Sequence, residues 1–184
     1  KTGIKIDRPI HRLFTVSKDN KIKMLINYST STIGDEISES RTERTNGKIY
    51  NHHENINTVR KMISAFENKD LDKSYSYYDE KATFIDINST DINKEFTLAE
   101  QKENDKKLFE MFDIVSIDQV GYPDYLHYEL DNYRVVQSWW KFRLIRKVDK
   151  KNIVLPIMFI DTFDDKGKIT NEILYYSQKV LEAK

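Results

Sequence analysis

The chain has 184 residues, and its 30 basic and 30 acidic side chains leave no formal net charge at pH 7. Because no net field attracts polyanions, this balance argues against nucleic acid, anionic lipid and acidic substrates as partners. The absence of Cys excludes disulfides, thiol nucleophiles and Cys-ligated metals, and no apolar run is long enough to span a bilayer.

The N-terminal third predicts a β-hairpin followed by a polar connection. Two runs rich in β-branched and aromatic residues fill Arg12–Tyr28 and flank the polar turn Ser17–Asn20. Ser29–Asn55 is dense in Ser, Thr, Glu and Asn and predicts a linker or an irregular surface segment. We therefore expect an N-terminal hairpin and linker over residues 1–54, and a separate domain over residues 55–184.

Three helices are expected next. The first begins near Asn55 or Asn57, either of which can cap exposed amides, and its apolar residues recur at helical spacing. A short helix follows over Leu71–Tyr78. Thr97 is expected to cap a third helix that ends near Phe112. Because the first half of this helix is almost wholly polar, we expect it to lie on the surface, anchored at its C-terminal end.

The rest of the chain is rich in β signals. The run KATFIDIN predicts a strand before the third helix, and from Ile114 onward the pattern is β throughout. Turn residues at Asp131-Asn132, at Asp149–Asn152 and before Gly167 join long strands as hairpins. Helices followed by hairpin-linked strands indicate an α+β fold, with the helices packed on one face of a curved, mainly antiparallel sheet.

Two segments of the chain repeat one another. Pro9–Tyr28 and Pro156–Tyr175 align without a gap at an offset of 147 (175 − 28), and their identical positions include the Pro and the final Tyr. We interpret this match as a duplication, in which the hairpin is the last two strands of a preceding copy. The alternative is a strand addition, in which the hairpin pairs with the sheet edge of this domain or of a partner.

The segment AFENKDLDKSYSYYDEKATFIDI, Ala65–Ile87, resembles the opening of the nuclear-transport-factor-2-like (NTF2-like) superfamily, which includes SnoaL-like polyketide cyclases and ketosteroid isomerase. FDDKGKI, Phe163–Ile169, resembles its final hairpin. The resemblance covers about Asn55–Lys184 and implies a cystatin-like cone around a pocket. It implies no single activity, because the superfamily hosts isomerases, cyclases, dehydratases, hydrolases and non-catalytic binding modules.

The resemblance also implies candidate catalytic residues. Asp86 falls on the general base of ketosteroid isomerase, whereas the oxyanion-stabilising Tyr and its partner acid fall on Met62 and Phe159. Both donors are therefore missing, and steroid isomerisation is not expected. Asp161, two residues after Phe159 on the same strand face, is a candidate to pair with Asp86, although an edge or solvent-facing role stays open. His127, in a Tyr-rich strand, is a further candidate.

Alternation in the run VVQSWWKFRLIRK separates two faces of one long strand. Trp140 belongs to the more apolar face, and Trp139 lies with long polar side chains on the other. We expect Trp139 to anchor a homodimer interface on the outer face of the sheet. The inner face is expected to contribute to an apolar ligand pocket lined by Met62, Tyr78, Trp140, Phe142 and Phe159.

Three functions stay open on the sequence alone. The first is a non-catalytic binding domain for a small hydrophobic molecule. The second is an acid–base enzyme of cyclase or isomerase type that uses Asp86, with Asp161 or His127. The third is an assembly module built on the outer sheet face and the hairpin. We expect no cofactor or metal, because phosphate loops and ligand spacings are absent. The start at Lys1 suggests that an upstream segment was removed, which leaves exported and cytoplasmic locations open.

Overall fold

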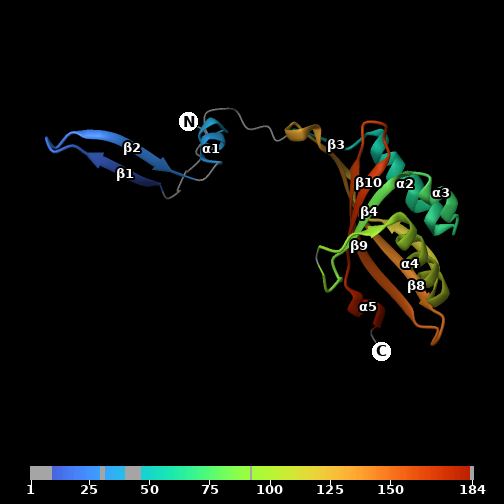
Figure 1. Ribbon diagram of the computed structural model, residues 1–184. Coiled ribbons are helices and arrows are strands. Elements are labelled where there is room, and N and C mark those ends of the chain that lie inside the picture. The colour runs from blue at the N-terminus through green and yellow to red at the C-terminus, as the bar shows by residue number, and fades with distance from the viewer. Residues whose placement is uncertain (1–9, 30–31, 40–46, 92, 183–184) are drawn as a thin grey trace. The chain divides into compact units, whose positions relative to one another are not determined.

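The computed structural model describes residues 10–29, 32–39, 47–91 and 93–182. The chain divides into two compact units, Lys1–Thr45 and Asn46–Lys184 (Figure 1). Pro9, where the sequence repeat begins, and residues 40–46 of the expected linker lie outside the described residues.

The division lies earlier than the expected boundary after residue 54, because the segment expected to be a linker contains regular structure. Helix α1 (Ile33–Glu39) belongs to the first unit. Strand β3 (Gly47–Tyr50) pairs with strand β7 (Asp124–Tyr128), so it belongs to the sheet of the second unit. The sequence did not predict this strand, because its surroundings are polar and its partner β7 is distant in sequence.

The first unit contains the predicted hairpin. Strands β1 (His11–Val16) and β2 (Ile22–Tyr28) pair antiparallel. Their turn closes where the backbone N–H of Ser17 donates to the carbonyl of Lys21 at 2.8 Å. Asn20 takes the left-handed conformation, with φ of 57°, which Asn tolerates better than most residues. Local turn chemistry therefore sets this hairpin.

Two helices open the second unit. Helix α2 (Glu54–Glu67) is capped by His53, whose Nδ1 accepts a hydrogen bond from the Asn55 backbone N–H at 3.1 Å. The cap therefore precedes the expected Asn caps, and Asn55 is buried inside the first turn. Helix α3 (Leu71–Tyr75) is shorter than predicted, because strand β4 (Tyr78–Asp86) begins at the residue expected to end it.

Helix α4 (Leu98–Met111) begins where the sequence predicted it. Thr97 accepts from the Glu100 backbone, and the Glu100 side chain accepts from the Thr97 backbone, which together form a capping box. Helix α5 (Gln178–Glu182) was not predicted, because the final run was assigned entirely to the sheet.

The sheet of the second unit is mixed and runs in the order β3-β7-β8-β9-β10-β4-β5, with β6 paired to β8. The β10–β4 pair is parallel, and the other neighbours pair antiparallel. Helices precede and cover a curved sheet, so the predicted α+β fold is confirmed (Figure 1). The remaining elements are β5 (Phe96–Thr97), β6 (Phe112–Gln119), the 3-10 turn η1 (Leu130–Asn132), β8 (Arg134–Arg146), β9 (Asn152–Phe163) and β10 (Ile169–Tyr175).

The core lies between helix α2 and the concave face of the sheet. Ile56 and Val59 of α2 are 0 % exposed, as is Val136 of β8. Burying each such side chain stabilises the fold by roughly 1.5–3 kcal/mol. Along β8, the set that includes Trp140 and Phe142 is buried, as the alternation predicted. Among the described residues, no helix is long and apolar enough to cross a membrane.

We predict a homodimer interface on the outer face of β8 and β9, anchored by Trp139. Trp139 is half-buried and lies opposite Met158, while Val154 nearby is 46 % exposed. Trp139→Ala should convert a dimer to a monomer in sedimentation velocity at micromolar concentration, because a central aromatic anchor carries much of an interface's energy. Val148→Ala, in the exposed turn after β8, is the matched control. A parent protein that sediments as a monomer would contradict the prediction.

Candidate functional site

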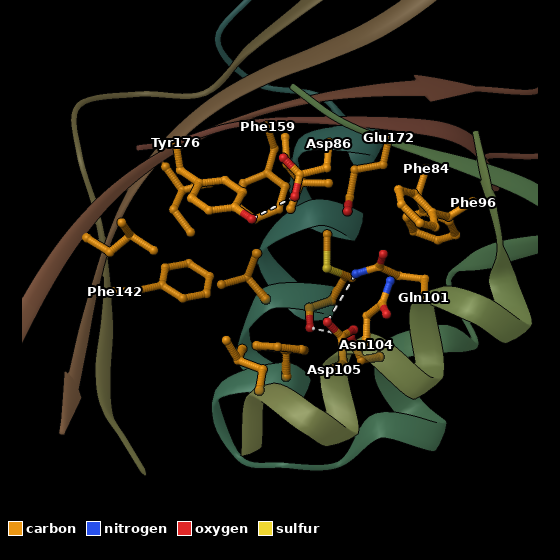
Figure 2. A pocket seen from close by; sticks show the side chains of 18 of the residues that line it. Phe84, Asp86, Phe96, Gln101, Asn104, Asp105, Phe142, Phe159, Glu172 and Tyr176 are labelled. Carbon is orange, nitrogen blue, oxygen red and sulfur yellow. Dashed lines mark hydrogen bonds between the residues drawn. The ribbon is translucent and has the colours of Figure 1, made fainter. Parts of the chain in front are cut away.

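A pocket of about 380 Å³ lies between the helices and the concave face of the sheet (Figure 2). Its wall is mainly apolar, and Phe142 and Phe159 from the sheet face Met62 from helix α2. The polar side chains are acidic, amide or hydroxyl groups, and none of the lining residues is basic. A small ligand would therefore meet hydrophobic surface with a few polar groups, as in most small-molecule sites.

Asp86 ends strand β4 and points into this pocket (Figure 2). The Tyr176 hydroxyl donates to its Oδ2 at 2.7 Å. Asn88 donates to its Oδ1 from the backbone N–H at 2.8 Å and from Nδ2 at 2.9 Å. These hydrogen bonds fix the orientation of the Asp86 carboxyl group at the pocket. Burial, and then the bond to Asp86, raises the pKa of Tyr176, so this phenol stays protonated as a donor.

Glu172 lies on the neighbouring strand β10 and lines the same pocket. Phe84 of β4 pairs with Glu172, and Asp86 pairs with Leu174, so the two acids occupy successive inward positions of adjacent strands. The Tyr78 hydroxyl donates to Glu172 Oε2 at 2.5 Å. Glu172 is 3 % exposed, and burial raises its pKa to about 7 despite this bond.

Asp161 pairs with Glu172 across strands β9 and β10 and lies behind it, 0 % exposed. Among the described residues, neither oxygen of Asp161 meets an N–H or hydroxyl donor. Burial first, and the neighbouring Glu172 second, raise the pKa of Asp161 well above its usual range. A protonated Asp161 can itself donate to Glu172, and such a hydrogen bond lowers the pKa of Glu172.

Asp105 supplies a third acid from the helical side of the pocket (Figure 2). It sits on α4, where it accepts from the Tyr75 hydroxyl and from Gln101 Nε2, the latter at 3.0 Å. Burial of the carboxyl group raises its pKa to about 7, although the residue as a whole is only half-buried. The polar half of α4, expected to face solvent, therefore contributes Gln101, Asn104 and Asp105 to the pocket.

The structure brings some of the predicted site residues together and separates others. Asp86 and four of the five predicted ligand contacts line the pocket, namely Met62, Tyr78, Phe142 and Phe159. Trp140 does not line it, although it is on the same face of β8. Its indole is buried in the core and donates to Ser138 Oγ at 2.9 Å. Alternation predicts which face of the strand a residue lies on, but it does not predict where along the strand the cavity opens.

Two candidate catalytic residues also lie outside the lining. Asp161 does not line the pocket and pairs with Glu172 across strands β9 and β10, so it does not pair with Asp86 as expected. His127 sits on β7, which β8 and β9 separate from β10, and its Nε2 lies 2.5 Å from Asn132 Oδ1. The Tyr-rich composition of its strand reflects ring contacts such as Tyr125 with His53, stacked at 3.7 Å.

Glu172, Asp105 and Tyr176 are among the polar lining residues that the sequence did not identify. Period-two alternation from Tyr176 back through Leu174 to Glu172 was the available signal for two of them. No local pattern marks Asp105, because which face of α4 meets the pocket depends on long-range packing. Within the described ranges, no group of three or more His, Asp or Glu residues is placed to hold a metal ion.

No family model matches this chain, and no curated protein matches its sequence. Solved structures do match it. One is a candidate isomerase from Bacillus subtilis, with 17 % identity, a TM-score of 0.55, and coverage of 70 % of this chain and 91 % of that one. Another is AclR, a candidate hydroxylase from Streptomyces galilaeus, with 11 % identity, a TM-score of 0.53, and coverage of 70 % and 92 %.

A third match is an NTF2-like protein from Burkholderia xenovorans LB400, with 17 % identity, a TM-score of 0.48, and coverage of 70 % and 93 %. At such identities these similarities concern the fold alone. Asn46–Lys184 shares with the first two of these structures an α+β fold of helices on a curved, mainly antiparallel sheet, which is the fold class that the sequence predicted.

Proposed function

We propose that the pocket of Asn46–Lys184 binds a small hydrophobic molecule and moves a proton on it, as an acid–base enzyme of isomerase or cyclase type. The observation that carries this proposal is the placement of Asp86 and Glu172 at successive inward positions of adjacent strands in one apolar pocket. Their surroundings differ, and paired carboxyl groups in different surroundings divide the roles of base and acid.

Asp86 is the base in this proposal. It is half-buried at the end of β4, and its hydrogen bonds from Asn88 and Tyr176 hold the carboxyl group where it can remove a proton from a ligand carbon. Glu172 is the acid, because burial raises its pKa to about 7, so that it is protonated in part at neutral pH. Glu172 would return a proton elsewhere on the ligand, and exchange with water would reset both groups.

Non-catalytic binding is the second candidate, and a specific observation favours it. The hydroxyls of Tyr75, Tyr78 and Tyr176 all donate to carboxyl groups, and Met62 and Phe159 occupy the positions where the resemblance implies oxyanion donors. Developing negative charge on a ligand oxygen would thus lack the phenol and acid donors that the resemblance implies. For this reason we expect negligible Δ5-to-Δ4 isomerisation of a steroid ketone.

The test separates binding from proton transfer with neutral probes. We expect N-phenyl-1-naphthylamine to bind with increased fluorescence, since the pocket is apolar and has no basic side chain. We expect the protein to catalyse deuterium uptake from D2O into 2-tetralone, followed by mass spectrometry. Asp86→Asn should slow this uptake by a factor of about 10²–10⁴, the usual contribution of a general base.

The matched control is Asp79→Asn on the same strand, outside the pocket, which should leave both measurements unchanged. Probe binding without deuterium uptake would favour the non-catalytic candidate. Absence of binding to the neutral probe would contradict both candidates. Robust steroid isomerisation, abolished in Asp86→Asn, would show that the missing donors are replaced by others.

A further inference from the structure

Hairpin β1–β2 of the first unit has the same pairing and the same turn bounds, position by position, as hairpin β9–β10 of the second unit. At the sequence offset of 147, the bounds of β2, Ile22–Tyr28, fall on those of β10, Ile169–Tyr175. The end of β1 at Val16 likewise falls on the end of β9 at Phe163. The two hairpins thus begin their turns and resume their strands at equivalent positions.

The pairing register is the same in both hairpins. His11 pairs with Tyr28, as Met158 pairs with Tyr175, and each following pair of β1–β2 has its counterpart in β9–β10. The bulge is also shared, because Lys23 is passed over between two pairs in the first hairpin as Thr170 is in the second. A bulge is a specific feature of a strand pair and rarely coincides by chance.

The turns match hydrogen bond by hydrogen bond. The Ser17 N–H donates to the Lys21 carbonyl at 2.8 Å, and the Asp164 N–H donates to the Lys168 carbonyl at 3.0 Å. The Lys21 N–H donates to the Ser17 hydroxyl at 3.1 Å, and the Lys168 N–H donates to Asp164 Oδ1 at 2.7 Å. The left-handed positions also coincide, at Asn20 and Gly167.

The surroundings of the two hairpins differ completely. In the second unit, β9 pairs with β8 and β10 pairs with β4, and Phe163 and Ile169 are 4 % and 0 % exposed. Their equivalents Val16 and Ile22 are 53 % and 61 % exposed. Within the described part of the chain, β1 and β2 form a sheet of two strands, each with an unpaired outer edge. Such a hairpin is marginal in water without a partner for its apolar face.

We propose that β1–β2 is the closing hairpin of a further domain, which has the same fold as Asn46–Lys184. The rest of that domain, including counterparts of β4, β8 and the covering helices, is supplied by the same polypeptide outside residues 1–184. Register, bulge and turn favour this occupant, because the equivalent hairpin in the second unit meets those neighbours on both edges. A second copy of this chain and the edge of this chain's own sheet are the competing occupants.

The two domains would differ in chemistry. The buried acid pair Asp161 and Glu172 corresponds to Phe14 and Leu25, which also face each other across the hairpin. The further domain therefore lacks the buried acid pair, and its interior at this level is apolar. Proton transfer would be confined to Asn46–Lys184. The further domain would bind a ligand or support the assembly without transferring a proton.

A graft tests whether the hairpin is built to close this fold. In the 184-residue chain, Pro156–Tyr175 is replaced by Pro9–Tyr28, with Phe159 and Leu174 retained. We expect one cooperative thermal transition of the second unit, as in the parent. The control graft takes Ile10–Ser29 instead, a shift of one residue that turns every side chain to the wrong face, and it should lose the transition. Equal behaviour of the two grafts would overturn the shared register.

Hydrogen exchange with mass spectrometry tests the occupant. Peptides covering β1 and β2 should exchange rapidly in the 184-residue chain and at least about 100-fold more slowly in the full polypeptide encoded by the gene, since pairing and burial protect amides. Protection already present in the 184-residue chain would overturn the proposal. If this protection does not vary with protein concentration, the occupant is this chain's own sheet. If the protection increases with protein concentration, the occupant is a second copy of the chain. A gene that encodes no further domain would also overturn it.

Discussion

Glu172→Gln is expected to remove much of the pH dependence of stability between pH 4.5 and about 7. These limits are the usual pKa of a Glu side chain and the pKa of Glu172 in the folded protein. The folded pKa is raised, so the native state binds a proton that the unfolded state releases in this window, and stability falls as pH rises. The loss is complete once pH exceeds the folded pKa. A shift of this size corresponds to roughly 3 kcal/mol, because Glu172 is almost fully buried.

The variant keeps an oxygen that can accept from the Tyr78 hydroxyl but has no charge to bury. We therefore expect urea midpoints for variant and parent to be similar at pH 5, and the variant to be the more stable protein at pH 8. Part of the slope should remain, because burial also raises the pKa of Asp105 and Asp161. Glu80→Gln, at an exposed position of β4, is the control. An unchanged slope in Glu172→Gln would contradict the buried proton.

Phe84→Ala should destabilise the second unit by about 3–5 kcal/mol, the usual cost of removing a buried phenyl ring. Phe84 is 1 % exposed, and its ring centre lies 5.1 Å from that of Tyr78, the donor to Glu172. A loss of this size is a large fraction of the stability of most domains. The measurement is the free energy of unfolding in urea at pH 7.

Phe96 provides the matched comparison, because it pairs with Phe84 across strands β5 and β4 and lines the same pocket. Phe96 is only half-buried, so Phe96→Ala should lower the free energy of unfolding by about 1–2 kcal/mol. Its larger effect should be on the affinity for the fluorescent probe. Figure 2 shows the two rings beside one another at the edge of the pocket. Equal destabilisation by the two substitutions would contradict this division between core and pocket wall.

The helix α4 illustrates what local sequence determines. Thr97 and Glu100 form a capping box through contacts three residues apart, so the start of the helix was predictable without tertiary information. The same holds for the turn Ser17–Asn20 and for the alternation that buries Trp140 and Phe142. Each of these features depends on neighbours in sequence and on the geometry of a single element.

The acids of the pocket illustrate what tertiary structure alone decides. Asp161 and Glu172 become a buried pair because β9 and β10 align in one register, and Asp105 enters the pocket because α4 packs with the face of Gln101, Asp105 and Leu108 toward it. A polar residue has no local signal for burial, since the cost of removing it from water is offset by partners distant in sequence. The sequence by itself thus determined the fold class and the elements with strong local signals, including the strand that ends at Asp86, whereas long-range packing decided which acids share the pocket and excluded His127 from it.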